Sequence, residues 1–370
     1  MRVLAYREPG ALVLEERPLP HPGDGEAVLR VEACAICGTD LRIASGAHAA
    51  YDHGAGRIPG HELAGTIVEA GRGARAVPGE RVFVAPNYGC GQCRWCRGGK
   101  VNLCVKPRAI GITEDGGFSE YLLLPSDLVA QGNLLPAGST AGAGAVALAE
   151  PLACALRGSR VCRIAEGDVV LVYGAGPVGL MHVALARLAG ASVVVCSRNS
   201  ERLKRALAWG ATSTHGSDPG ELRAALAAAG ACGGADVVIV AAPAPLAQRQ
   251  AIEMAAPGGR VNFFAGLPRG RSTAELDTNL IHYRELLVTG TTASTNAECR
   301  EALSLILDGR IDVGSLIDAT FGLGSARDAF ELARSGRAMK VVIGAGARCG
   351  ADTQDSGPRE TAPTETVGES

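Results

Sequence analysis

The sequence predicts an α/β protein with two domains, one mainly β with long loops and one built on a doubly wound parallel sheet. Short apolar runs punctuated by proline and glycine fill roughly the first 150 residues, as expected for strands and turns. From Asp168 onward, β-branched runs alternate with helix-periodic segments, which is typical of βαβ units. The 370 residues, 47% of them hydrophobic, suffice for two cores of ordinary size.

The mainly β domain is predicted from its apolar runs and the turns that separate them. Pro9-Gly10 and the segment Val77–Glu80 are expected turns. The expected strands are Val3–Tyr6, Leu12–Glu15, Ala27–Glu32, Leu63–Ala70, Arg81–Ala85 and Gly117–Pro125.

The parallel-sheet domain follows a helix predicted over Leu148–Arg160. Its expected strands are Val169–Tyr173, Ser192–Cys196, Ala235–Val240, Arg260–Ala265 and Leu286–Gly290, and its expected helices are Pro177–Leu188, Ser200–Trp209 and Leu246–Ala255. Two further helices, Ala297–Leu307 and Ser325–Ala333, and a closing strand, Lys340–Ile343, are expected after them. Residues 348–370 show no periodicity and are predicted to form a disordered tail.

Charge and composition exclude several classes of partner. The net charge is −2 and there is no basic block, which argues against nucleic acid or an anionic membrane as a partner. The stretch Val169–Ala186, which has no Asp, Glu, Lys or Arg, contains several glycines and fits a buried strand and helix better than a membrane span. The N-terminus shows no signal-peptide pattern, and the twelve cysteines favour metal binding in a reducing compartment. We therefore expect a cytoplasmic protein.

Four cysteines in one loop predict a structural zinc site. Cys90, Cys93 and Cys96 recur at three-residue steps, and Cys104 follows. Four thiolates can close a tetrahedral zinc shell with no position left for water. Four unrelated thiols or an iron–sulfur cluster are the alternatives.

A second group of possible metal ligands lies between Cys34 and Glu62. Cys37, His61 and Glu62 offer a thiolate, an imidazole and a carboxylate, a set that suits zinc. The pattern alone also fits a cysteine buried as a small apolar residue. The other motifs of the chain must decide between the two.

A glycine-rich turn predicts a dinucleotide site. Gly174, Gly176, Pro177, Val178 and Gly179 follow a predicted strand and open a predicted helix. In this context the glycines allow a tight turn, a close approach of the backbone to a pyrophosphate, and close packing of helix and strand. The phosphates would lie at the helix N-terminus.

The end of the next strand favours NADP over NAD. NAD-binding domains place a carboxylate there for the ribose, whereas this strand ends in Ser197 and Arg198. Arginine suits a 2′-phosphate. NAD stays possible, because Arg198 could instead be a solvated charge or stack on the adenine.

Taken together, these motifs resemble the zinc-dependent branch of the medium-chain dehydrogenase/reductase superfamily, over about residues 1–346. The resemblance includes Gly60–Glu62, Cys37–Asp40, the four-cysteine loop, Glu150–Leu152 and the glycine-rich turn. It implies a GroES-like catalytic domain over 1–153, completed by 292–347, and a Rossmann domain over 154–291. It also implies NAD(P)-linked oxidation of an alcohol or reduction of a carbonyl group.

The resemblance assigns roles to individual residues. Cys37 and His61 match the ligands of a catalytic zinc, so that two zinc ions per chain are expected with the structural one. Glu150 and Glu62 each match a carboxylate that either coordinates the metal or supports it, and Thr39 matches a hydroxyl that relays the substrate proton. Arg42 departs from the pattern, because sorbitol- and threonine-dehydrogenase-like members often have histidine there.

The expected substrate is a small polar alcohol or ketone with several hydroxyl groups. The loop from Arg42 to Arg57 carries His48, Tyr51, Asp52 and His53 among small residues, whereas a fatty alcohol would need a bulkier apolar lining. We expect a secondary alcohol and its ketone on a sugar alcohol, a cyclitol or aminocyclitol, or a sugar phosphate. A simple short-chain or aromatic alcohol dehydrogenase, and a non-catalytic NADPH-binding relative, are the alternatives. By analogy with the family, the protein would be a homodimer or homotetramer.

Overall fold

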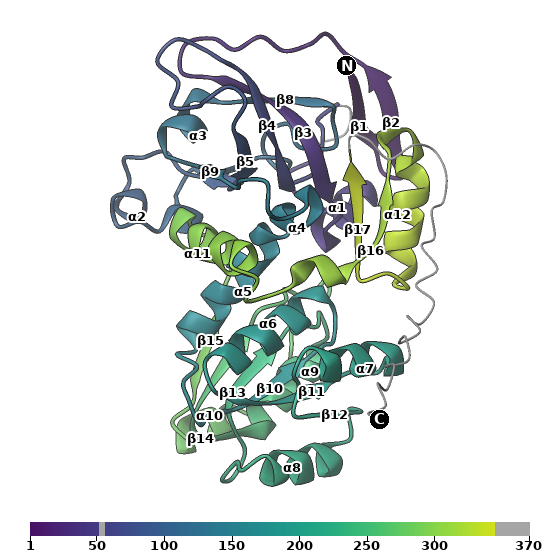
Figure 1. Ribbon diagram of the computed structural model, residues 1–370. Helices are drawn as coiled ribbons and strands as arrows, with labels where there is room; N and C mark the ends of the chain where they lie inside the picture. Colours follow the sequence, from purple (N-terminus) through teal and green to yellow (C-terminus); the bar gives the residue numbers. More distant parts are fainter. Residues whose placement is uncertain (52–55, 345–370) are drawn as a thin grey trace, which may run out of the picture.

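The computed structural model describes residues 1–51 and 56–344, which form two domains (Figure 1). The N-terminal and C-terminal parts of the chain share the upper domain, and the middle of the chain forms the lower one. The tail predicted over 348–370 lies outside the described residues, as do Asp52 and His53 of the predicted substrate loop.

The upper domain is built on a seven-stranded sheet in the order β16-β17-β3-β4-β5-β9, with β8 paired to β3. Two short two-stranded sheets, β1-β2 and β6-β7, flank it. The strands from the N-terminal part are β1 (Arg2–Glu8), β2 (Ala11–Glu16), β3 (Ala27–Ala35), β4 (Glu62–Ala70), β5 (Arg81–Val84), β6 (Asn87–Tyr88), β7 (Arg108–Ala109), β8 (Tyr121–Leu124) and β9 (Leu134–Pro136). The short helices between them are α1 (Gly38–Ala44), α2 (Arg94–Arg97), η1 (Val101–Leu103), α3 (Ser126–Ala130) and α4 (Ala143–Ala147).

The C-terminal segment returns to this sheet and completes it. It consists of α11 (Asn296–Leu307), η2 (Val313–Leu316), β16 (Ile317–Phe321), η3 (Leu323–Ser325), α12 (Ala326–Ser335) and β17 (Lys340–Gly344). Val342 of β17 pairs with Ala35 of β3 in an antiparallel register. Residues from the two ends of the sequence therefore meet in one sheet.

The lower domain is a six-stranded parallel sheet in the order β12-β11-β10-β13-β14-β15, with helices on its faces (Figure 1). This is the Rossmann order, which reverses next to β10 and creates a ligand-binding crevice at the carboxyl ends of the strands. The strands are β10 (Val169–Tyr173), β11 (Ser192–Cys196), β12 (Ser213–His215), β13 (Ala235–Val240), β14 (Ala255–Phe263) and β15 (Leu287–Gly290). The helices are α6 (Pro177–Leu188), α7 (Ser200–Ala208), α8 (Pro219–Ala228), α9 (Pro245–Met254) and α10 (Thr278–Tyr283).

Helix α5 (Ala149–Val161) joins the two domains. A single buried apolar cluster extends from Phe83 of β5 through Leu148 and Leu152 to Val172 of β10. Arg157 of α5 also donates a hydrogen bond of 3.2 Å to Glu298 of α11. The apolar contacts hold the start of α5 between the two sheets, and the hydrogen bond of Arg157 fixes its later part to α11. Over residues 1–51 and 56–344, no helix has the length and apolarity needed to cross a membrane.

The predicted α/β class and most predicted elements are confirmed, with some differences in bounds. The strand predicted over Gly117–Pro125 covers only Tyr121–Leu124, and the one predicted over Arg260–Ala265 covers Ala255–Phe263. The sequence pattern did not predict the helices α1, α2, α3, α4, α8 and α10, the strands β6, β7, β9, β12 and β16, or the turns η1, η2 and η3. Most of them are short, so few residues carry a periodic signal. The exact domain boundaries at 153, 291 and 347 stay predictions.

Candidate metal centres and cofactor site

Cys37, His61 and Glu62 lie together at one end of the upper sheet. Strands β3 and β4 are antiparallel neighbours, and Ala35 pairs with Glu62. Cys37 follows β3 as the N-cap of α1, and His61 directly precedes β4. One ligand atom from each of the three residues lies within 4.8 Å of the others. The sheet register therefore creates this group.

Gly60 is needed to bring His61 to this position. Its φ of +103° lies in the region that favours glycine. A Cβ at Gly60 would lie 2.7 Å from the Cys34 sulfur and 3.0 Å from the backbone nitrogen of Phe118. The sulfur of Cys34 fills the space next to Gly60, and Cys34 is completely buried, so we assign it a packing role.

The carboxylate of Asp40 lies next to both Cys37 and His61. Its Oδ2 accepts a hydrogen bond of 2.8 Å from the backbone N–H of Cys37. Its Oδ1 lies 3.6 Å from Nδ1 of His61, and neither of these buried atoms has a hydrogen-bond partner. A carboxylate beside one imidazole nitrogen orients the other toward a metal. The donor set and the unpartnered atoms thus fit a zinc ion.

Lys340 supplies a buried positive charge to this group and was not identified from the sequence. Its Nζ donates to both carboxylate oxygens of Glu62, at 2.6 and 2.5 Å, and both side chains are buried. Burial disfavours the charge on Lys340, but Glu62 and Cys37 outweigh this effect and raise its pKa. The first residue of β17 therefore holds the side chain of Glu62 in place.

Glu150 lies beside the three-residue group and not within it. It is buried in the first turn of α5, and its Oε1 accepts a hydrogen bond of 3.4 Å from the thiol of Cys154. Burial raises the pKa of the Glu150 carboxyl, and the charge of nearby His61 opposes this shift. The predicted third ligand is thus brought within electrostatic reach of His61.

Thr39 occupies the first turn of α1, directly after the cysteine. Its Oγ1 accepts a hydrogen bond of 2.9 Å from the exposed guanidinium of Arg42. Arginine stays protonated under all ordinary conditions, so Arg42 cannot receive a proton from Thr39. The hydroxyl of Thr39 therefore keeps its own proton available for a ligand.

The four cysteines of the predicted structural site surround a common point. The sulfurs of Cys90, Cys93, Cys96 and Cys104 all lie within 4.8 Å of one another. Cys93 is 3.6 Å from Cys96 and 3.9 Å from Cys104. Tetrahedral zinc with Zn–S bonds of about 2.3 Å requires sulfurs about 3.8 Å apart. The lobe thus has the dimensions of a closed zinc site.

Backbone N–H groups favour the thiolate form in this lobe. Cys90 and Lys106 each donate a backbone hydrogen bond of 3.3 Å to the sulfur of Cys104. Backbone N–H groups of Cys96 and Val105 lower the pKa of the Cys93 thiol to about 6. Thiolates are the form that binds a metal.

The glycine-rich turn lies between β10 and α6, as the dinucleotide motif requires. A Cβ at Gly179 would lie 1.9 Å from the carbonyl oxygen of Gly174, so only glycine allows this contact of helix and turn. Gly176 is the N-cap of α6, which has Pro177 in its first turn and no side-chain cap. The first N–H groups of α6 are therefore free for a phosphate.

Ser197 and Arg198 follow β11 at the same edge of the sheet. Arg198 is exposed, and in the described part of the chain its guanidinium has no hydrogen-bond or ion-pair partner. Arg202, four residues on, was not singled out from the sequence. It donates a hydrogen bond of 2.8 Å to the carbonyl of Gly336 in the upper domain, and its guanidinium approaches Gly176. Arg202 thus bridges the two domains next to the phosphate-binding turn.

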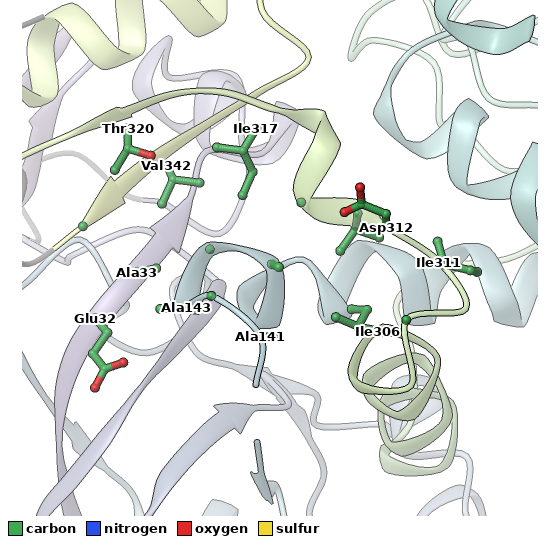
Figure 2. A pocket seen from close by; sticks show the side chains of 17 residues that line it. Glu32, Ala33, Ala141, Ala143, Ile306, Ile311, Asp312, Ile317, Thr320 and Val342 are labelled. Carbon is green, nitrogen blue, oxygen red and sulfur yellow. The ribbon is translucent and has the colours of Figure 1, made fainter. Parts of the chain in front are cut away.

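The structure also contains a cavity of about 700 Å³ (Figure 2). Its lining includes residues of β3, α4, α11, η2, β16 and β17, and is mostly small or aliphatic. Of its two acidic residues, Glu32 is already paired with Arg81 at 3.0 Å. None of the predicted site residues lines this cavity, so its size does not make it the catalytic site.

Comparisons with known proteins agree with this arrangement. A sequence model of the alcohol dehydrogenase GroES-like domain matches residues 23–136, and one of zinc-binding dehydrogenases matches residues 177–308. L-galactonate-5-dehydrogenase of Escherichia coli K12 is 40% identical over 203 residues, which are 55% of this chain and 57% of that enzyme. L-threonine 3-dehydrogenase of Saccharopolyspora erythraea is 32% identical over 93% of this chain and 98% of its own.

Solved structures share the fold over nearly the whole described chain. One is the NADP-bound crystal structure of a Sinorhizobium meliloti 1021 protein described as a zinc-binding dehydrogenase. It is 34% identical, with a TM-score of 0.83 over 93% of this chain and 99% of its own. The chain therefore belongs to the zinc-dependent medium-chain dehydrogenase/reductase superfamily, whose members oxidise alcohols with NAD(P).

Proposed function

We propose that this zinc-dependent dehydrogenase prefers NADP and interconverts a secondary alcohol and a ketone on a polyhydroxylated substrate. The observation that carries the proposal is the combination of the Cys37–His61–Glu62 group with an unpaired Arg198 beside the dinucleotide turn. The similarity to an L-galactonate-5-dehydrogenase supports a substrate with several hydroxyl groups.

We infer that Cys37, His61 and Glu150 would hold the catalytic zinc, with Glu62 as a supporting carboxylate. Lys340 engages both oxygens of Glu62, which favours this division of roles. When bound, zinc supplies a Lewis acid that lowers the pKa of a substrate hydroxyl, and NADP supplies a hydride acceptor. Cys90, Cys93, Cys96 and Cys104 would hold the structural zinc.

The chain's own residues position the substrate and move its proton. The Thr39 hydroxyl lies two residues from Cys37 and can accept the substrate proton while it passes on its own. Arg42 donates to Thr39 and cannot take that proton, so the exit route must use water or another group. Arg202 holds the two domains together beside the phosphate turn, which keeps cofactor and substrate in fixed relative positions.

A metal assay and a substrate panel test the proposal. Protein purified without added metal should contain about two zinc ions per chain. Reduction of NADP, followed by nicotinamide absorbance, should be fastest with polyols or polyol acids and slow with ethanol or benzyl alcohol. A preference for ethanol or benzyl alcohol would favour the simple alcohol dehydrogenase. NADPH binding without turnover of any alcohol would favour the non-catalytic relative.

We also propose a homodimer or homotetramer. Strand β15 forms an open edge of the six-stranded sheet, and Leu287 and Val288 on it are 57% and 37% exposed. Exposed apolar edge strands are a common place for a second chain to pair. Light scattering after gel filtration should give twice or four times the chain mass, and a monomer would contradict the proposal. A cytoplasmic location stays a prediction.

A further inference from the structure

Arg42 carries a positive charge that no carboxylate neutralises. Among residues 1–51 and 56–344, its guanidinium has no acidic partner within 4.0 Å, and the side chain is exposed. Several arginines of the upper domain are paired, such as Arg81 with Glu32 at 3.0 Å and Arg108 with Glu114 at 2.8 Å. Other exposed arginines, such as Arg75, also lack an acidic partner within the same residue ranges. What distinguishes Arg42 from Arg75 is its hydrogen bond to Thr39, next to the candidate catalytic group.

The position of the guanidinium is fixed with respect to that group. Arg42 lies on the same short helix that Cys37 begins, and it donates to the hydroxyl of Thr39 at 2.9 Å. A molecule whose hydroxyl contacts Thr39 would thus lie within reach of the remaining N–H groups of Arg42. A guanidinium offers five donors in a planar fork that matches a carboxylate or a phosphate.

His48 is a second polar group near Arg42. The side chain is half-buried, and burial is the main reason why its pKa is lowered. The charges of nearby Arg42 and His61 lower it further. Its Nδ1 accepts a hydrogen bond of 3.3 Å from the backbone N–H of Ala50, which leaves Nε2 as a donor. His48 thus lies near both Arg42 and the zinc-ligand candidate.

The acidic side chains of the candidate site are already engaged. Asp40 accepts the N–H of Cys37, Glu62 is paired with Lys340, and Glu150 accepts the thiol of Cys154. None of them pairs with Arg42. The unneutralised cation beside the proton-relay hydroxyl is therefore left for a ligand.

We propose that Arg42 is a specificity-determining residue that binds an anionic group of the substrate, so that the enzyme acts on an acidic polyol. The anionic group is a carboxylate, as in a sugar acid, or a phosphate, as in a polyol phosphate. The inference rests on the proposed function, since it concerns the substrate of the same site. A different role for Arg42, in binding the cofactor phosphates, predicts a different result in the experiment below.

Three matched substrates test the inference: galactitol, L-galactonate and galactitol 1-phosphate, each with saturating NADP. The wild-type enzyme should have a higher kcat/KM for at least one of the two anions than for galactitol. Arg42→Gln should lower kcat/KM for that anion by roughly 10- to 100-fold, the range of a charge-assisted hydrogen bond, mainly through KM. Galactitol, which has no anionic group, should lose less kcat/KM than that anion, so that the anion preference falls. Arg42→Lys should retain part of the anion preference, and the anion affected identifies carboxylate or phosphate.

Arg75→Gln is the matched control, because Arg75 is also an exposed arginine of the upper domain and is not part of the site. It should leave all three substrates unchanged. Two results would overturn the inference. In one, Arg42→Gln loses as much kcat/KM with galactitol as with the anions. In the other, its KM for NADP rises while the anion preference is kept.

Calorimetry separates this inference from the proposed function. L-galactonate and galactitol 1-phosphate should be titrated into the enzyme–NADP complex of the wild type and of Arg42→Gln. Binding that depends on Arg42 supports the anion site even if none of the three compounds is oxidised, a result that would count against the proposed function alone. Absence of Arg42-dependent binding for both anions overturns the inference.

Discussion

The two candidate metal centres of this protein are assembled in opposite ways. The four-cysteine lobe takes all its ligands from one loop between β6 and β7, and three of the four cysteines are only partly buried. The Cys37–His61–Glu62 group combines residues from two strand ends, and Lys340 joins it from 278 residues beyond Glu62. One centre is local in sequence, whereas the other depends on the finished sheet.

The two centres also differ in the charged groups that surround them. In the lobe, four thiols face one another and backbone N–H groups donate to the sulfur of Cys104, so a cation would be needed to neutralise four thiolates. In the catalytic group, Lys340 already neutralises Glu62, and Asp40 is hydrogen-bonded to the backbone. We infer that metal in the lobe serves mainly stability and that metal in the catalytic group serves mainly reaction.

The largest expected effect comes from removing the catalytic thiolate. Cys37→Ala should lower turnover by at least about 1000-fold, because the Lewis acid contributes several kcal/mol to the transition state. Zinc content should fall from about two ions per chain to about one. Steady-state kinetics and metal analysis on the same sample measure both effects.

Cys34→Ala is the control for that substitution. Cys34 lies three residues away, is fully buried and does not belong to the metal-binding group. It should keep both zinc ions and most of the turnover, with a loss of stability of about 1 kcal/mol from the small cavity. Loss of the catalytic zinc in Cys34→Ala would contradict the assignment of Cys37.

The next largest expected effect comes from Lys340, the residue of β17 that joins the Cys37–His61–Glu62 group to the sheet. Lys340→Met should lower the free energy of unfolding by about 3–5 kcal/mol, because it leaves the buried carboxylate of Glu62 without a partner. Chemical denaturation measures the change. The double variant Lys340→Met with Glu62→Leu should recover part of the loss, and a double variant as unstable as the sum of the singles would show that the pair is not coupled.

The same contrast explains what could be predicted from the sequence. The lobe ligands and the glycine turn are close in sequence, so spacing alone was enough to single out Cys90–Cys104 and Gly174–Gly179. Cys37 and His61 were singled out from their residue types as possible ligands, but the other motifs and the family resemblance were needed to favour a metal site. Lys340 was not, because it opens a strand that the apolar pattern predicts correctly, while the pairing of that strand with β3 follows from the tertiary fold. Arg202 was missed for a similar reason, since its partner Gly336 lies in the other domain.

Removal of the lobe's metal should have a smaller effect on stability and little on chemistry. Cys93→Ser should remove the structural zinc and lower the free energy of unfolding by about 2–4 kcal/mol, the contribution of a ligand that binds only the folded state. Turnover per remaining zinc should stay within about threefold of wild type, since the catalytic ligands are untouched. Cys232→Ser, at an exposed cysteine outside both groups, is the control. A loss of turnover as large as in Cys37→Ala would break the division between the two centres.

The smallest expected effect concerns the cofactor, which binds in the lower domain, away from the four-cysteine lobe. Replacing Ser197→Asp together with Arg198→Leu adds a carboxylate for the ribose of NAD and removes a cation for the 2′-phosphate of NADP. The ratio of kcat/KM for NADP to that for NAD should fall by roughly 10- to 100-fold, and zinc content should not change. Arg223→Leu, which removes another exposed arginine of the lower domain, should leave the ratio unaltered. If the NADP/NAD ratio of kcat/KM also stays unaltered in the double variant, Arg198 does not bind the 2′-phosphate. Arg202, which already lies beside Gly176 and joins the two domains, would then be the next residue to exchange.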